Sequence, residues 1–236
     1  MSYPPWSKLN EHSAEEHACH HHAFKTLLLE RICTLTSTST LIQGKGKDVD
    51  IQLLNARNDE AYLLETRNSR RYSAGWILVD RARLAACVYA FRTKPVAESA
   101  PLLFQCVKRD LVDEDTRAKV RIVPHDVALA VSAVFFGQII ERRHKLVPKQ
   151  VIGEIKTAFG DSSVAGCTVF CFAGRTFYSL FSCGRYLGTA CVDLNRMTED
   201  LHFESGCDFL SELVVEEDSY LETFRINVDH VFPETT

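Results

Sequence analysis

The chain has 236 residues, of which 46% are hydrophobic and 25% charged, with 11 glycines and 7 prolines. This composition excludes a disordered or collagen-like chain and is sufficient for one large domain, or for a core domain and a smaller one. The 27 Lys and Arg against 31 Asp and Glu give a formal net charge of −4. That balance disfavours a protein that coats nucleic acid through bulk positive charge, although it permits a local basic groove.

The first ten residues lack the basic and apolar regions of a signal peptide. The longest apolar stretch, residues 127–140, is interrupted by polar residues and is shorter than the roughly 20 residues that span a bilayer. The nine cysteines have no zinc-knuckle spacing and are expected to be small buried hydrophobic residues. We therefore expect a protein of the reducing cytoplasm that does not associate with a membrane.

The first half of the chain predicts a helix followed by strands. Ser13 and Glu16 have the spacing of a capping box, and apolar residues at steps of three and four extend this helix to about Leu35. His17 and His21 share its apolar face and are interpreted as partly buried histidines; the alternative is a zinc-binding pair, because the two residues have the i, i+4 spacing of helical metal ligands. Strands are expected at residues 49–54, 61–66 (a hairpin with the first), 76–79, 86–91 and 102–107, with a helical turn at 81–85.

The second half predicts two helices and an antiparallel meander. Pro124 and Asp126 open a buried helix that ends near His144, and residues 148–159 predict a shorter helix. The meander is expected over strands 168–173, 176–182 and 186–193, because Gly-Arg pairs separate them. Residues 199–222 contain nine acidic residues and no Lys or Arg, which predicts an acidic C-terminal face. No internal repeat is apparent.

Two carboxylates and a cation are placed on neighbouring predicted strands. Asp48 or Asp50 enters or lies in the first strand, and Glu65 and Arg67, two residues apart, project from the same side of the next. Carboxylate oxygens hold Mg²⁺ while phosphate and water complete its coordination. A nearby cation offsets charge on the scissile phosphate. This pattern is typical of metal-assisted phosphodiester cleavage.

The same stretch resembles the core of the PD-(D/E)xK nucleases, especially their small phage-encoded branch, over about residues 41–107. The motifs that carry the resemblance are Asp50-Ile-Gln-Leu53, Leu63-Leu-Glu-Thr-Arg-Asn68, the Gly75-Trp76 turn, and the strand through Tyr89. The resemblance implies that Asp50 and Glu65 bind Mg²⁺ or Mn²⁺ and that Arg67 stands where lysine is usual. It also implies that Glu16 or Glu30 supplies a further carboxylate from the preceding helix.

The position of the catalytic motif has two possible registers. In the second register Asp50 and Gln52 form the motif, Gln52 replaces the lysine, and Glu65 belongs to the following strand. The structural alternative to both registers is a surface ion pair between Glu65 and Arg67.

Basic and flat side chains flank the candidate carboxylates, where they could follow a phosphate backbone and stack on bases. The candidate nucleic-acid-binding residues are Arg70, Arg71, Trp76, Arg81 and Arg83. The alternative interpretation is a solvated turn balanced by the acidic C-terminal segment.

These patterns predict an α/β (α+β) fold with a nuclease-like mixed sheet, flanking helices and a C-terminal antiparallel meander. Residues 1–115 are expected to form the nuclease-like part and residues 116–236 the remainder, with the two parts free to pack as one domain. The expected function is metal-dependent cleavage of DNA or RNA in phage or viral nucleic-acid processing or counter-defence, in the host cytoplasm. The alternative is an inactive interaction protein on the same scaffold, which binds a host or viral protein through its acidic C-terminal half.

Overall fold

The computed structural model describes residues 25–26, 28–49, 60–92, 94–96, 98–144, 162–172, 175–193, 203–204 and 220–229. The chain divides into two compact units. The described residues from 25 to 128 belong to the first, here called the N-terminal unit, and those from 129 to 229 belong to the second, the C-terminal unit. The division falls later than the expected boundary at residues 115–116, because residues 116–123 form a strand of the first sheet.

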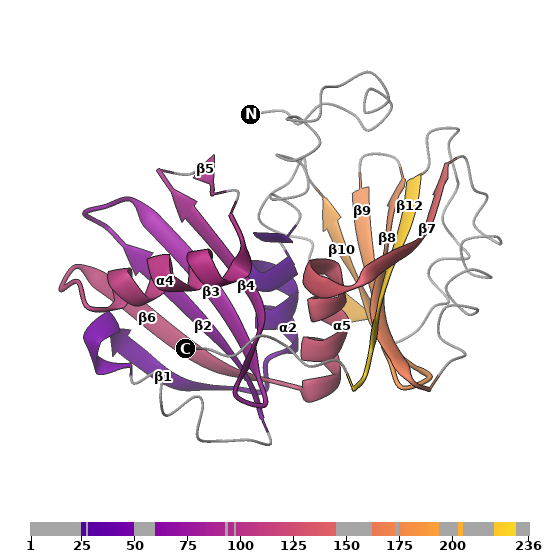
Figure 1. The fold of residues 1–236 in the computed structure, drawn as a ribbon, viewed down its shortest axis with the longest axis horizontal. Coiled ribbons are helices and arrows are strands. Elements are labelled where there is room, and N and C mark those ends of the chain that lie inside the picture. Colours follow the sequence, from indigo (N-terminus) through magenta and orange to yellow (C-terminus); the bar gives the residue numbers. More distant parts are fainter. Residues whose placement is uncertain are drawn as a thin grey trace. The chain divides into compact units, whose positions relative to one another are not determined.

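The N-terminal unit contains a six-stranded sheet in the order β1-β6-β2-β3-β4-β5 (Figure 1). The strands are β1 (Ser39–Lys45), β2 (Ala61–Asn68), β3 (Ser73–Asp80), β4 (Arg83–Phe91), β5 (Lys94–Pro95) and β6 (Thr116–Val123). The α+β class is confirmed. The expected mixture of parallel and antiparallel pairing is not found among the described strands, because β6 lies between β1 and β2 and runs antiparallel to both.

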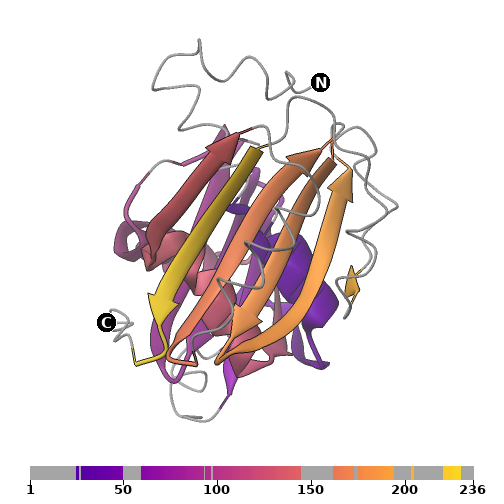
Figure 2. The same ribbon diagram turned by 90° about the vertical axis from the view of Figure 1, so that its right-hand side faces the viewer.

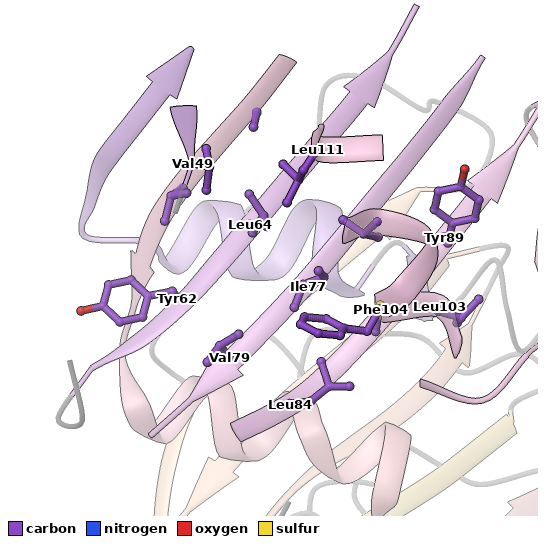
Figure 3. Close-up of a cluster of buried hydrophobic side chains, with 14 residues drawn as sticks. Val49, Tyr62, Leu64, Ile77, Val79, Leu84, Tyr89, Leu103, Phe104 and Leu111 are labelled. Carbon is purple, nitrogen blue, oxygen red and sulfur yellow. The ribbon is translucent and has the colours of Figure 1, made fainter. Parts of the chain in front are cut away.

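Helix α4 (Ala100–Leu111) covers one face of this sheet. Its buried residues Leu103, Phe104, Val107 and Leu111 recur at helical spacing and pack on side chains from β2, β3, β4 and β6 (Figure 3). The strand expected at residues 102–107 is therefore wrong. Pro101 in the first turn is a helix-start signal that outweighs the apolar run.

The opposite face of the sheet contacts a shorter helical segment. A π-helical turn, η2 (Leu28–Ile32), continues directly into α2 (Cys33–Thr36). Leu28, Leu29 and Ile32 are fully buried, and η2 lies against β3 while α2 lies against β6. The C-terminal end of the expected N-terminal helix is thus confirmed, and the capping box and the histidines lie outside the described residues.

The C-terminal unit contains a second antiparallel sheet in the order β11-β10-β9-β8-β12-β7 (Figure 2). The strands are β7 (Gln138–His144), β8 (Val164–Phe172), β9 (Arg175–Ser182), β10 (Arg185–Asp193), β11 (Phe203–Glu204) and β12 (Tyr220–Asn227). The predicted meander is confirmed, because β8 pairs with β9 and β9 with β10. Its second turn consists of Cys183 and Gly184, one residue earlier than expected, and both have positive φ.

Helix α5 (His125–Phe136) begins in the N-terminal unit and ends in the C-terminal unit. The expected continuation to His144 is wrong, because residues 138–144 form β7. Gly137 makes this change of direction possible. A Cβ atom at Gly137 would lie 2.3 Å from the carbonyl oxygen of Ala133 and 2.5 Å from that of Arg225, so the close approach of β12 requires glycine.

The two units repeat one topology. In each unit, a helical segment precedes the edge strand, which is β1 in the first unit and β7 in the second. The next three strands form a meander, and a two-residue strand pairs beside it. The last strand, β6 or β12, inserts between the edge strand and the meander. Residues 25–123 and 125–227 are the two repeats. The expectation of no internal repeat is therefore not matched by the topology, which the described strands of the two units share.

The helical turn expected at residues 81–85 is wrong, because Arg81 and Ala82 form a turn with positive φ and β4 begins at Arg83. Cys33, Cys87 and Cys167 are buried as expected, whereas Cys183 is exposed. No helix among the described residues is long and apolar enough to cross a membrane. The helix expected at residues 148–159 lies outside the described residues.

Candidate functional site

Glu65 lies in the middle of β2, on the face of the sheet that contacts η2 and α2. Its Oε1 accepts a hydrogen bond from Nε of Arg67 at 2.8 Å, and its Oε2 accepts one from Nη1 of Arg121 on β6 at 3.0 Å. The side chains of Glu65 and Arg121 are 17% and 12% exposed. Each carboxylate oxygen of Glu65 is therefore engaged by a guanidinium group in a largely buried setting.

The helical segment is attached to the same network. Nη2 of Arg67 donates to Oε1 of Glu30 at 3.0 Å, and Nη1 of Arg121 donates to Oγ1 of Thr34 at 3.2 Å. Glu30 is one of the two helix carboxylates, Glu16 or Glu30, that the family resemblance implies as a further metal ligand. Here it binds the cation beside Glu65, so the network joins the helical segment to the sheet.

The charges around Glu65 govern its protonation. Burial alone would raise its pKa, but the hydrogen bonds and charges of Arg67 and Arg121 together outweigh burial, and the pKa lies below its ordinary value. Glu65 is therefore ionised at neutral pH and is paired with two cations.

The donor set around Glu65 does not fit Mg²⁺ or Mn²⁺. Both of its oxygens face guanidinium groups, and Glu30, the carboxylate beside the same network, is bonded to Arg67. Two fixed cations at this range would repel a third. The described part of the chain contains no group of three or more His, Cys, Asp or Glu side chains that could hold a metal. Asp50, the other predicted ligand, and Gln52 lie outside the described residues, so neither motif register is tested.

A row of three basic side chains crosses the same face next to this network. Arg67 on β2 lies opposite Arg117 on β6, and Arg117 lies opposite Lys45 on β1. Residues directly opposite on antiparallel strands project from the same face. Lys119, two residues along β6, extends the basic surface. Lys45, Arg67, Arg117 and Lys119 are called the basic row below.

Most of the basic row has no counter-charge. Lys45, Arg117 and Lys119 form no ion pair with any residue that the structure describes, and Lys45 and Arg117 are exposed. Arg67 is the exception, because it binds Glu65 and Glu30. The edge of the sheet formed by β1 and β6 therefore carries a net positive charge.

The second repeat shows that the fold does not require charge at these positions. The ladders β2–β6 and β8–β12 each contain eight opposed pairs. We align the two ladders so that the pair Ala61–Val123 coincides with the pair Val164–Asn227. In this alignment the Arg67–Arg117 pair corresponds to the Phe170–Leu221 pair. Phe170 and Leu221 are both fully buried. The same scaffold thus accepts an apolar pair where the first repeat carries two arginines.

The structure separates the predicted nucleic-acid-binding residues. Arg70 and Arg71 lie in the turn between β2 and β3, whereas Arg81 and Arg83 lie at the opposite end of β3. Trp76 is in the middle of β3 and only 5% exposed, with the Arg67 guanidinium 6.0 Å from its ring centroid. These five residues do not form one surface, and Trp76 is buried in this unit.

Lys45, Arg117 and Lys119 are basic residues that the sequence analysis missed. The signal for β6 is present in the sequence, because basic residues alternate with Ala118, Val120 and Ile122, as in a strand with one charged face. Most of the acidic segment 199–222, the basis of the protein-binding alternative, lies outside the described residues.

No family model matches the chain, and no curated protein shows a significant match. Among solved structures, the Helicobacter pylori β clamp in complex with carprofen shares 10% identity, with 80% of this chain and 66% of that chain covered and a TM-score of 0.19. The β subunit of DNA polymerase III from Pseudomonas aeruginosa shares 8% identity, with 82% and 67% covered and a TM-score of 0.17. The chain spans about two thirds of these proteins, and TM-scores this low support no inference about fold or function.

Proposed function

We propose that the chain binds nucleic acid through the basic row and does so without cutting it. The observation that supports this proposal is Arg117, which lies directly opposite both Lys45 and Arg67, together with the lack of an acidic partner for Lys45, Arg117 and Lys119 among the described residues. Like charges placed opposite each other on neighbouring strands destabilise a sheet. The row is therefore best explained by an anionic ligand that lies across it, and a phosphate backbone is a ligand with repeated negative charges.

The proposed binding would be sequence-independent. Lysine and arginine contacts to phosphates position a protein on nucleic acid without reading bases. Each phosphate that is neutralised releases counterions, so affinity should fall steeply as salt increases. The overall charge of −4 is compatible with this mode, because the attraction comes from the local row.

In this proposal Glu65 is a positioning residue. Its two hydrogen bonds hold Arg67 and Arg121 in place, and its carboxylate is occupied by those contacts. The metal-dependent nuclease that the family resemblance implies is the second candidate, and the observation that favours it is the position of Glu65 beside the basic row.

The direct test is fluorescence anisotropy with a labelled duplex at several salt concentrations. Arg117→Ala should lower affinity several-fold at low salt and reduce the slope of log affinity against log salt by about one. Lys108→Ala is the matched control, because Lys108 lies on α4, which covers the other face of the sheet. Equal affinity for wild type and Arg117→Ala would contradict the proposal.

Cleavage is measured in parallel with Mg²⁺, with Mn²⁺ and in chelator. The proposal predicts that the duplex stays intact under all three conditions. Metal-dependent cleavage that disappears in Glu65→Gln would support the nuclease instead.

A further inference from the structure

A pocket of about 610 Å³ lies where the β2–β3 turn meets the end of β4. It is lined by Arg70, Arg71, Tyr72, Phe91 and Arg92. The backbone N–H of Arg92 donates to the carbonyl oxygen of Tyr72 at 2.7 Å, which joins its two sides. The pocket therefore combines two aromatic rings with three guanidinium groups.

Both aromatic rings are exposed to an unusual degree. Tyr72 is 73% exposed and Phe91 is 42% exposed, and exposed large aromatic side chains are characteristic of binding surfaces. Tyr72 also has a φ of 54°, and Arg92 a φ of 50°. These left-handed conformations favour glycine or asparagine. An aromatic residue in a strained turn, with its ring in solvent, contributes little to packing, so its presence calls for another explanation.

The arginines are arranged around these rings. Arg71 is anchored by Asp113, with Nε 3.1 Å from Oδ2, and by buried Asp110, with Nη1 3.5 Å from Oδ1. The guanidinium of Arg92 lies 5.3 Å from the centroid of the Phe91 ring. Arg70 is exposed and also lines the pocket. Arg71 is thus held by two carboxylates, and the exposed residues Arg70 and Arg92 line the same pocket beside the aromatic rings.

We propose that this pocket binds a nucleotide of single-stranded nucleic acid. The base would stack on Tyr72 and Phe91, and the phosphates would contact Arg70 and Arg92. Stacking on exposed aromatic rings combined with arginine contacts to the backbone is how single strands are bound without sequence preference. Duplex bases are already stacked on each other, so the pocket would select unpaired nucleotides.

This inference rests on the proposed function, since it assigns a second contact for the same class of partner. It adds a preference for single strands and a location outside the basic row. The row and the pocket lie at the same end of the sheet, because Arg67 is close to the β2–β3 turn and Ser73 on β3 lies opposite Phe91.

The experiment compares three probes by anisotropy: oligothymidine, an abasic strand of the same length, and a blunt duplex. Tyr72→Gly removes the ring and suits the positive φ, so the variant should fold at least as well as the wild type. It should weaken oligothymidine binding about tenfold and leave duplex and abasic-strand binding unchanged, given the size of base–aromatic stacking. Tyr72→Phe is the matched control and should bind as the wild type does.

The remaining outcomes contradict either the nucleotide pocket or the proposed function, and they distinguish between the two. Unchanged oligothymidine binding in Tyr72→Gly, or equal wild-type affinity for oligothymidine and the abasic strand, overturns the inference while the basic row can still bind duplex. If Arg117→Ala leaves duplex binding unchanged, the proposed function fails, and 5′-phosphorylated dithymidine tests the pocket alone. Absence of dithymidine binding, with Tyr72-dependent binding of oligoglutamate, would overturn the inference in favour of an acidic peptide.

Discussion

Arg67 on β2 and Arg117 on β6 lie directly opposite each other, and only Arg67 has carboxylate partners among the described residues. Glu65 and Glu30 bind Arg67, whereas Arg117 extends into solvent between Arg67 and Lys45. Two neighbouring arginines therefore have different roles. Arg67 holds the helical segment to the sheet, and Arg117 is available to an external anion.

The first prediction concerns Arg117→Leu. The substitution removes a like-charge contact, and Leu221 fills the corresponding position in the second repeat, so the free energy of unfolding should rise by about 0.5 kcal/mol. The gain should shrink in high salt. Urea denaturation measures it. Arg121→Leu, in the same strand, is the control and should destabilise by about 1–3 kcal/mol because Glu65 loses a buried partner. Destabilisation by Arg117→Leu would show that Arg117 has a structural partner.

The second prediction concerns pH. The pKa of Glu65 is lowered in the folded state, so its ionised form stabilises the fold above the unfolded value of about 4.3. This contribution is lost as pH falls through the lower folded pKa. Glu65→Gln should therefore be less stable than wild type at neutral pH. Its stability should also vary less between about pH 5 and about pH 3. Parallel stability curves for the two proteins over this range would contradict the prediction.

The third prediction compares equivalent turns of the two repeats. Ala82 has a φ of 60° in the turn between β3 and β4, and Gly184 has a φ of 72° in the turn between β9 and β10. Ala82→Gly should raise the free energy of unfolding by about 0.5–1 kcal/mol because it relieves a left-handed conformation. Gly184→Ala should lower it by about 1 kcal/mol. Thermal unfolding distinguishes the two, and a loss of stability in Ala82→Gly would be inconsistent with strain at this turn.

The fourth prediction concerns the end of α5. A Cβ atom at Gly137 would meet two backbone carbonyl oxygens at 2.3 and 2.5 Å, and neither can move without displacing α5 or β12. Gly137→Ala should therefore destabilise by about 1–3 kcal/mol. Gly44→Ala is the control, because the nearest atom to its Cβ would be Oδ2 of Asp48 at 3.8 Å. Equal losses in the two variants would mean that the close approach is not the cause.

Local patterns predicted part of the fold. The meander from β8 to β10 was predictable because alternating residues and glycine turns are local signals. Helix α4 was missed because its short apolar run fits a strand as well as a helix, and only Pro101 distinguishes the two. The insertion of β6 between β1 and β2 depends on pairing between distant segments, as in Glu65 opposite Lys119. No local pattern reports such a pairing.

The candidate site was predicted in part for the same reason. Glu65 and Arg67 were singled out together and are in contact, because residues two apart on a strand share a face. The contact with Arg121 could not be anticipated from sequence, because it spans 56 positions and depends on the register of β6. Arg81 and Arg83 were grouped with Arg70 and Arg71 by nearness in sequence, although the whole of β3 separates them.

The position of β6 also has a consequence for the order in which the chain can fold during synthesis. β1 has no partner among the described strands other than β6, and β7 has none other than β12. Each edge strand therefore remains unpaired until the last strand of its own sheet has emerged from the ribosome. That strand is β6 (residues 116–123) for β1 and β12 (residues 220–227) for β7. At roughly 5–20 residues per second, the first sheet can close about 5–20 s before the second. A nascent chain that stops before β6 would expose β1 as an unpaired edge, the kind of surface on which partly made proteins aggregate.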